Sequence, residues 1–483
     1  MKTNQLALQS HGSISHAPTD PHQLAARFRK LLFNDPHGHP ALRFWRDEFW
    51  RYRDGRYRQI SDAELKAKIT SFIKDEFRRT KAANRGGEIL QVNTGLVANV
   101  KLALMGDLLV ESHLDQPIWL GSGGDSGPYF SFTNGRVGIE GLVNGDRRDI
   151  MPHCSYWFSQ TAFPYDYDTA AMCPRWVAFL KEVLEDDDER IALIQQWFGY
   201  CLTPDTSQQR FVVIVGEGAN GKSVMLDVLA ALLGPDNVSH VRVELFAQRF
   251  QLTMTLGKLA NISYDTGEID ESAEATIKEF TGGDRMYFDR KGVPGVTASP
   301  TARLILATNH DPRFADRSIG IWRRMIVIPF RVTIEQDRQD PDLASKLKAE
   351  LPGIFNWAVE GLRELRRRHQ FVVPSICHEA WEEFKRESNP AREFLMDSYI
   401  SGSGSCGCTD IYDEYRAWSK ERGFTSLDAM NFGKELSKVF PNVERKRDSA
   451  GERRYRYHGL RPIGVDLTLD PLREAPMDNA NAS

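Results

Sequence analysis

One short stretch of the chain has the residue types and spacing that bind the phosphates of a nucleotide. Residues 216–223 read Gly-Glu-Gly-Ala-Asn-Gly-Lys-Ser and match the pattern G-x-x-x-x-G-K-[ST]. In such a loop the glycines let backbone N–H groups close around a β-phosphate, Lys222 reaches the β and γ oxygens, and Ser223 ligates Mg²⁺. The sequence therefore predicts a site for ATP and Mg²⁺ formed by Gly216, Glu217, Gly218, Ala219, Asn220, Gly221, Lys222, Ser223 and Val224.

The segments on either side of this loop predict the strand and the helix that position it. Residues 211–215, Phe-Val-Val-Ile-Val, form an apolar run with β-branched side chains, which is typical of a strand buried on both faces. Apolar side chains then recur at helical spacing from Val224 to Leu233, and Gly234-Pro235 ends the helix. A helix N-terminus after the loop adds a favourable dipole at the phosphates. A chance glycine-rich turn is the alternative, and both flanks argue against it.

Hydrolysis needs a carboxylate that orients the metal and a group that positions water. Residues 259–265 form a second strand-like run that ends in Asp265. A carboxylate at the carboxyl end of a strand faces the nucleotide crevice in such sheets, so we predict that Asp265 holds the Mg²⁺ side of the site. Glu268 is a candidate for polarising the attacking water. Glu268, Asp270 and Glu271 equally fit a solvated acidic start of a helix.

Two further strands supply the remaining candidates. Residues 303–308 end in Asn309, whose uncharged amide can hold the attacking water or a γ-phosphate oxygen. Asn309 also opens a turn sequence, Asn-His-Asp-Pro, so a structural role is the alternative. Arg323 and Arg324 immediately precede the apolar run 325–330. An arginine at this position can reach the nucleotide of a neighbouring subunit, which makes hydrolysis depend on assembly.

Composition limits the classes of partner. A chain of 483 residues is expected to hold about three domains. Its 62 basic and 66 acidic side chains give a net charge of −4, so any contact with nucleic acid must come from local patches. Cys406 and Cys408 form the single close cysteine pair, and no histidines next to them complete a zinc site. Scattered cysteines indicate a reducing compartment, and no apolar run is long enough to predict a membrane partner.

Residues 44–60 alternate aromatic and basic side chains around Asp54-Gly55, which predicts a β-hairpin. A helix is expected to follow over residues 62–81. Such a ribbon can stack bases and hold phosphates. An amphipathic hairpin whose aromatic face packs against the core is the competing interpretation.

The C-terminal part of the sequence predicts a small DNA-binding module. Residues 401–405, Ser-Gly-Ser-Gly-Ser, have the composition of a flexible linker. Two helices, about 411–420 and 429–439, and a basic hairpin are expected to follow, and this order suggests a winged helix. A solvated surface hairpin is the alternative. The cations predicted to contact DNA are Arg445, Lys446, Arg447, Arg454 and Arg456.

Together these motifs resemble the superfamily 3 helicases, and more narrowly the helicase half of phage- and plasmid-type primase–helicases and their poxvirus relatives. The resemblance covers approximately residues 40–465. Its motifs occur in one order, at 197–204, 216–223, 258–268, 280–284, 304–309, 321–324 and 351–357. It implies an α/β fold with an AAA+-like P-loop core, a homo-hexameric ring, and ATP-driven 3′-to-5′ movement on single-stranded DNA.

The resemblance also implies roles for individual residues. Lys222, Ser223, Asp265, Asn309 and one of the two arginines, Arg323 or Arg324, take the roles given above. The segment 284–300 resembles the DNA-gripping hairpin of the family, which places Arg290 and Lys291 in the channel. Six copies of one or two cations form a positive ring even in a chain of net charge −4.

The domain plan that follows is an AAA+-like core with an α+β N-terminal domain and a C-terminal winged helix. Its parts are a disordered tail (1–21), the N-terminal α+β and helical domain (22–200), the ATPase core (201–370), a helical connector (371–400), the winged helix (401–465) and a second disordered tail (466–483).

The resemblance implies an ATP-dependent replicative DNA helicase of a phage, plasmid or integrated element, acting on single-stranded and forked duplex DNA. An origin-melting initiator or loader ATPase without processive unwinding is one alternative, and a nucleotide-switched assembly protein is another. Relatives often carry a primase domain ahead of this region, and only a short segment precedes it here, so we expect any primase to be a separate partner. The expected location is the cytoplasm of a bacterial host or of a virus-infected cell.

Overall fold

The computed structural model of the chain describes residues 19–83, 91–121, 127–145, 149–309, 313–314, 319–387, 389–424, 426–447 and 454–463. The chain divides into two compact units between His378 and Glu379. Both predicted tails lie largely outside the described residues. Among the helices that are described, none combines the length and the apolar character that crossing a membrane requires.

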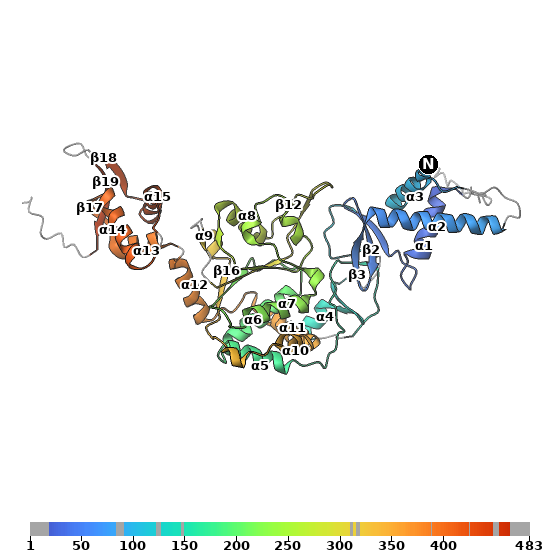
Figure 1. The fold of residues 1–483 in the computed structure, drawn as a ribbon, viewed down its shortest axis with the longest axis horizontal. Helices are drawn as coiled ribbons and strands as arrows, with labels where there is room; N and C mark the ends of the chain where they lie inside the picture. Colours follow the sequence, from blue (N-terminus) through green and yellow to red (C-terminus); the bar gives the residue numbers. More distant parts are fainter. Residues whose placement is uncertain are drawn as a thin grey trace, which may run out of the picture. The chain divides into compact units, whose positions relative to one another are not determined.

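A five-stranded parallel sheet forms the centre of the first unit (Figure 1). Its strand order is β16-β8-β14-β10-β9, so β14 lies between β8 and β10. All side chains of β14 and β16 are buried, as expected for a parallel sheet covered on both faces. The strands are β8 (Phe211–Val215), β9 (Val238–Ser239), β10 (Ala260–Tyr264), β14 (Arg303–Thr308) and β16 (Met325–Pro329).

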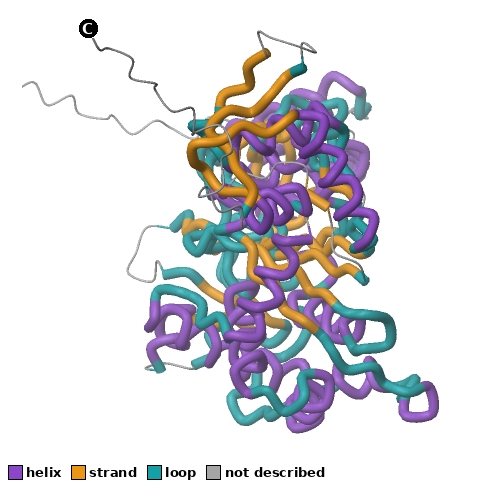
Figure 2. The backbone as a smooth tube through the Cα atoms, turned by 90° about the vertical axis from the view of Figure 1, so that its left-hand side faces the viewer, coloured by secondary structure: helices purple, strands orange, loops and turns teal. Residues whose placement is uncertain are grey.

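Strands and helices alternate through this part of the chain, as predicted. Figure 2 distinguishes the helices, strands and loops of the described residues by colour. The helix after β8 lies on one side of the sheet and α8 on the other (Figure 1). The elements after β8 are α7 (Lys222–Leu233), β11 (Glu268–Ile269), α8 (Glu271–Gly282), β12 (Met286–Phe288), β13 (Val296–Ala298), β15 (Arg313–Phe314), α9 (Ile319–Trp322), α10 (Leu343–Lys348) and α11 (Leu351–Arg368).

The hydrophobic core of this sheet extends beyond the predicted domain border at residue 200. It runs from Phe130 to Cys377 and includes the apolar stripe of Trp176, Phe179 and Leu180. Helices α5 and α6, which precede β8, pack their apolar side chains into the same core as α7 and α11. This core therefore has no break at residue 200. The preceding elements that join it are β5 (Tyr129–Phe132), β6 (Gly135–Gly138), α4 (Ile139–Asn144), α5 (Pro174–Val183) and α6 (Asp188–Cys201).

The N-terminal part of the first unit has its own apolar cluster, formed by three helices and a three-stranded sheet. The predicted hairpin and the helix after it are both confirmed. Phe49 and Tyr57 are buried, and the Tyr57 hydroxyl donates to the backbone oxygen of Ser155 over 2.6 Å, which favours the packing interpretation of the aromatic face. The elements are α1 (Pro21–Leu32), β1 (Leu42–Trp45), β2 (Glu48–Arg53), β3 (Arg56–Ile60), α2 (Asp62–Ala83) and α3 (Thr94–Asp107), with the later pair β4 (Ile118–Trp119) and β7 (Trp157–Phe158).

The second unit packs three helices against a three-stranded sheet of order β17-β19-β18. The prediction of a flexible linker at 401–405 was wrong, because these residues lie in β17, where Ser401 and Ser405 pair with β19 on either side of an irregularity in the register. A side-chain carbon on Gly404 would lie 2.9 Å from the backbone oxygen of Leu460, so the small residues permit close strand approach. The elements are α12 (Ser375–Glu387), which begins before the division, α13 (Pro390–Ser398), β17 (Tyr399–Gly407), α14 (Cys408–Glu421), α15 (Ala429–Val439), β18 (Glu444–Arg447) and β19 (Tyr455–Pro462).

This second core also starts earlier than the predicted border at 401. Ala391 and Phe394 of α13 are buried in the same cluster as Tyr415 and Phe432. The predicted order of two helices and a hairpin is confirmed, and one further helix and one further strand complete the module.

Close contact between α6 and α11 gives a test of the core. A side-chain carbon on Gly199 would lie 2.3 Å from the backbone oxygen of Ala358 and 2.5 Å from the backbone nitrogen of Leu362. Gly199→Ala should therefore lower the free energy of unfolding by about 1–3 kcal/mol through overpacking, measured by urea unfolding. Gly106→Ala is the control, because a side-chain carbon there meets nothing within 4 Å. Equal stability of the two variants would contradict this packing.

Candidate functional site

The predicted phosphate loop connects β8 to the first turn of α7. Gly216 lies against the end of β16, where a side-chain carbon would be 2.3 Å from the backbone oxygen of Phe330. Gly221 has a φ of +85°, and a side-chain carbon there would be 2.7 Å from Cγ1 of Val183. Ala219 also adopts a left-handed conformation, with a φ of +59°. The loop is thus held in a fixed shape that other residue types at Gly216 and Gly221 would disrupt.

Lys222 is buried at the centre of this loop. Its ammonium group donates to the backbone oxygens of Gly216 and Glu217, the latter over 3.3 Å, and to Oδ1 of Asn309 over 3.2 Å. Burial lowers the pKa of Lys222, and the negative charge of Asp265 opposes that shift. Two of the predicted site residues on other strands therefore interact with the loop lysine.

The strand order explains why these residues meet. Thr308 of β14 pairs with Val215 of β8, and Tyr264 of β10 pairs with Ala307 of β14. All three strands are parallel, so their carboxyl ends, and the residues that follow them, lie at one edge of the sheet. Asp265 and Asn309 are both exposed at this edge. Asp265 has a φ of +49°, an uncommon conformation that clusters at functional sites.

The loop offers the remaining predicted groups around this edge. Ser223 is exposed in the first turn of α7, at the positive end of the helix dipole. Asn220 is buried, and its side-chain nitrogen donates to the backbone oxygen of Glu217. Gly218 and Ala219 are exposed, and Val224 is half-buried in α7. The exposed part of the loop and Ser223 are therefore available to a ligand.

Tyr264 is the last residue of β10 and directly precedes Asp265. It interacts with Asp227 of α7, and burial raises the pKa of Tyr264 to about 12. A neutral phenol cannot take a proton from water, so Tyr264 is excluded as a general base at neutral pH. The backbone of Glu268 pairs with Arg313 in β11 and β15, but its side chain lies outside the described residues, so its catalytic role stays a prediction.

The alternative role for the neighbouring acids is confirmed. Asp270 is the N-cap of α8, and its carboxylate accepts a hydrogen bond of 2.8 Å from the backbone nitrogen of Ala273. Glu271 lies in the first turn of the same helix. Both acids stabilise the positive end of that helix.

Arg323 and Arg324 lie at the opposite edge of the sheet from the phosphate loop. They precede β16, whose first residue, Met325, pairs with Phe211 at the start of β8. Arg324 is half-buried and donates to the backbone oxygen of Gly320 over 2.8 Å, and burial lowers its pKa. Arg323 is exposed. Both arginines are therefore separated from the loop 216–223 of their own protomer by the length of β16.

Strands β12 and β13 form the hairpin predicted over 284–300. The guanidinium of Arg290 points back into the protein and donates to Glu48 over 3.0 Å, to the backbone of Arg46 over 3.1 Å and to that of Pro294 over 2.8 Å. A DNA contact by Arg290 stays a prediction that requires these bonds to break. Lys291, at the tip, is exposed.

Sequence reasoning missed a set of ion pairs that connects this hairpin to the N-terminal part of the unit. Asp115 accepts hydrogen bonds from Arg285 at 2.6 Å and from Arg46 at 2.5 Å. Glu48 of the N-terminal part likewise pairs with Arg290 of the hairpin, and burial raises the pKa of Glu48. Arg285 and Asp115 are separated by 170 positions. No spacing rule in the sequence identifies contacts over such a separation.

The basic hairpin of the second unit is formed by β18 and β19. The guanidinium of Arg445 lies 4.4 Å from the ring centre of Tyr455, and Arg456 donates to the backbone oxygen of Ser405 over 2.7 Å. The aromatic contact orients Arg445 along the hairpin surface. The predicted cations on exposed positions are Arg445, Lys446, Arg447 and Arg454, whereas Arg456 is half-buried.

Two family models match separate parts of the chain. Residues 214–324 match a family of unknown function, DUF5906, and this range contains the phosphate loop, Asp265 and Asn309. Residues 388–464 match the RFX DNA-binding domain, which coincides with the second unit from α13 onward. The chain therefore joins a parallel α/β core to a module that is similar to a known DNA-binding domain.

The chain is related to viral proteins that are named as helicases. It is 24% identical over 272 residues to "Putative helicase L207/L206" of Acanthamoeba polyphaga mimivirus, covering 50% of this chain and 28% of the relative. It is 22% identical over 340 residues to "Putative helicase 184R" of Invertebrate iridescent virus 6, covering 60% of this chain and 34% of the relative. The matches thus span about a third of the length of these relatives.

The chain also aligns with the solved structure "The apo structure of NrS-1 C terminal region (305-718)". Its sequence is 12% identical, and the alignment covers 92% of this chain and 99% of that chain with a TM-score of 0.48.

The position of Lys222 gives a direct test of the phosphate site. Lys222→Ala should lower magnesium-dependent ATP turnover by at least about a hundredfold, because charge developing on the γ-phosphate loses its closest cation. Lys181→Ala, an exposed lysine in α5, is the matched control. Turnover within a few-fold of the unmodified protein in Lys222→Ala would remove this loop as the site of hydrolysis.

Proposed function

We propose that the chain is the subunit of an ATP-dependent DNA helicase of the superfamily 3 type, with an AAA+-like core that works as a homo-hexameric ring. The observation that carries the proposal is the position of the predicted residues on the sheet. Lys222, Asp265 and Asn309 lie together at one edge, and Arg323 lies at the other. The names of the viral relatives support a helicase, and the RFX match supports DNA as the partner.

Each group at the first edge has a role that its chemistry can perform. Backbone N–H groups of residues 216–221 and the N-terminus of α7 bind the β-phosphate. Mg²⁺, when bound, would be held by Ser223 and by Asp265, and it would neutralise charge on the β and γ oxygens. Lys222 exchanges its bonds to loop carbonyls for bonds to phosphate oxygens. Asn309, already bonded to Lys222, is placed to orient the attacking water or a γ oxygen.

The distance across the sheet supports a catalytic site shared between protomers. The first and last residues of the five-residue strand β16 are roughly 13 Å apart. An arginine side chain cannot cover that distance around the edge of its own sheet. Arg323 is the stronger candidate for the arginine that reaches a neighbour, since Arg324 is held by Gly320 within its own protomer.

Two surfaces are proposed to bind DNA. The first is the tip of the β12–β13 hairpin, where Lys291 is exposed and six copies in a ring create a concentrated positive charge. The second is the β18–β19 hairpin of the RFX-like module, with its exposed arginines. The hairpin tip would track single-stranded DNA, and the module would contact duplex DNA.

Displacement of a labelled strand from a tailed duplex tests the helicase function. We expect the purified protein to displace the strand with Mg²⁺ and ATP and not with a non-hydrolysable analogue. DNA-stimulated ATP hydrolysis without displacement would favour the initiator or loader. Hydrolysis that is insensitive to DNA would favour the nucleotide-switched assembly protein.

A substitution at Lys291 tests how the proposed helicase binds DNA. Lys291→Ala should leave basal ATP hydrolysis intact and weaken its stimulation by single-stranded DNA, because a phosphate contact is lost in every subunit. Lys74→Ala, on the exposed side of α2, is the matched control. An unchanged response to DNA over a range of salt concentrations would place the contact elsewhere.

A further inference from the structure

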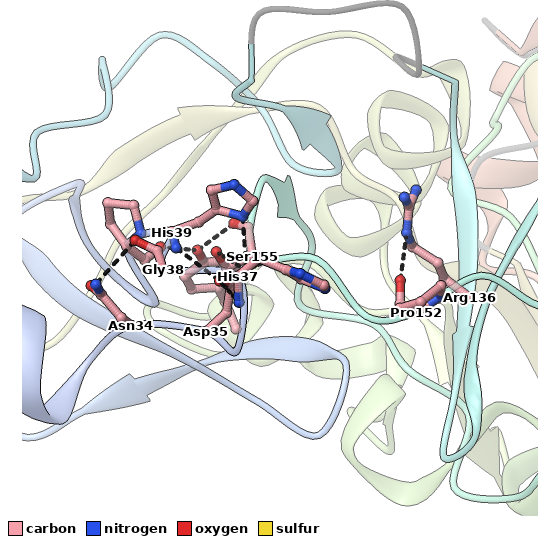
Figure 3. Close-up of polar contacts among 10 residues, drawn as sticks. Asn34, Asp35, His37, Gly38, His39, Arg136, Pro152 and Ser155 are labelled. Atoms are coloured by element: carbon pink, nitrogen blue, oxygen red, sulfur yellow. Dashed lines mark hydrogen bonds and ion pairs between the residues drawn. The ribbon is translucent and has the colours of Figure 1, made fainter.

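Two loops that are far apart in the sequence bring three metal-binding side chains together. Asp35 and His39 lie between α1 and β1, and Cys154 lies just before β7. One carboxylate oxygen, one imidazole nitrogen and the Cys154 sulfur all lie within 4.8 Å of one another. Asp35 is buried, and His39 and Cys154 are half-buried. Figure 3 shows the loop from Asn34 to His39 folded around Asp35 beside Ser155.

The carboxylate and the imidazole already have the spacing of two metal ligands, and in the absence of metal they are within hydrogen-bond distance of each other. Oδ2 of Asp35 and Nδ1 of His39 are 3.1 Å apart. Zinc binds imidazole nitrogen and carboxylate oxygen at about 2.0–2.2 Å in tetrahedral geometry, which separates neighbouring ligand atoms by roughly 3.3 Å. The Asp35–His39 pair therefore already has the separation of two ligands. The Cys154 sulfur lies within 4.8 Å of both atoms, so it would have to move closer to them to complete a tetrahedral shell.

Supporting hydrogen bonds hold the carboxylate in place, as the partners of metal ligands do. Oδ2 of Asp35 accepts from the hydroxyl of Ser155 over 3.0 Å and from its backbone nitrogen over 3.3 Å. Oδ1 accepts from the backbone nitrogens of His37 and His39 over 2.9 Å and 2.8 Å. Two loops 120 positions apart thus fix the orientation of a single carboxylate.

We propose that Asp35, His39 and Cys154 bind a divalent transition metal and that Zn²⁺ fits this donor set best. Thiolate and imidazole ligands favour zinc over Mg²⁺ and Ca²⁺, which take oxygen ligands. The fourth position is filled by water or by His37, which is exposed, with its ring centre 6.0 Å from that of His39. The metal would join the loop before β1 to the loop before β7 and so strengthen the N-terminal part of the first unit. The inference is independent of the proposed helicase function.

Metal content and spectroscopy of the full chain test this site. After incubation with Zn²⁺ and removal of excess metal, we expect one bound zinc per chain by mass spectrometry, and Co²⁺ in its place should show a thiolate-to-cobalt absorption band. Cys154→Ser should abolish that band. It should also weaken zinc binding by more than the roughly 10- to 100-fold that loss of a supporting hydrogen bond costs.

Controls separate loss of a ligand from loss of structure. Cys408→Ser and His113→Ala change a half-buried cysteine and an exposed histidine elsewhere and should keep the zinc. Asp35 also accepts hydrogen bonds within its own loop, so a substitution there could disturb the fold. The nearly isosteric Cys154→Ser is therefore the variant that tests metal binding. Circular dichroism verifies that this variant is folded. Zinc should raise the thermal midpoint of the unmodified chain and not that of Cys154→Ser. Equal zinc content and equal thermal shifts in these two proteins would overturn the proposal.

Discussion

The insertion of β14 between β8 and β10 is the constraint on which the rest of the site depends. Parallel pairing brings the carboxyl ends of these three strands to one edge, and the residue that follows β14 then lies between the phosphate loop and the acid that follows β10. Asn309 can therefore touch Lys222, and Asp265 is near enough for its charge to act on the same ammonium. The same parallel arrangement places Arg323 and Arg324, which precede β16, at the opposite edge of the sheet.

Ion pairs connect the N-terminal part of the first unit to this core. Arg285 and Arg290 of the hairpin region pair with Asp115 and Glu48, which belong to the part that precedes the sheet. Glu48 is substantially desolvated, and removing one partner from such a pair costs more than the pair contributes. The hairpin is therefore held by Arg285 at its base and by Arg290 in its turn, while the neighbouring Lys291 is exposed.

Local patterns were enough to predict the elements whose chemistry is local. The loop 216–223, the strand before it and the hairpin around Asp54-Gly55 follow from glycine placement and alternation, and the structure contains each of them. The Ser-Gly run at 401–405 was misinterpreted because composition cannot distinguish flexible residues from small residues in an irregular part of a strand. Contacts between distant segments, such as Arg285 with Asp115, depend on the tertiary fold and leave no local pattern.

Mixing two inactive proteins tests most directly the claim that neighbouring protomers share one catalytic site. Lys222→Ala removes the phosphate-site lysine and keeps Arg323, whereas Arg323→Ala removes the far-edge arginine and keeps Lys222. Each protein alone should hydrolyse little ATP. A mixture should recover part of the activity, because some interfaces then pair an intact loop with an intact arginine. Co-assembly without any activity above the sum of the two separate proteins would contradict the account.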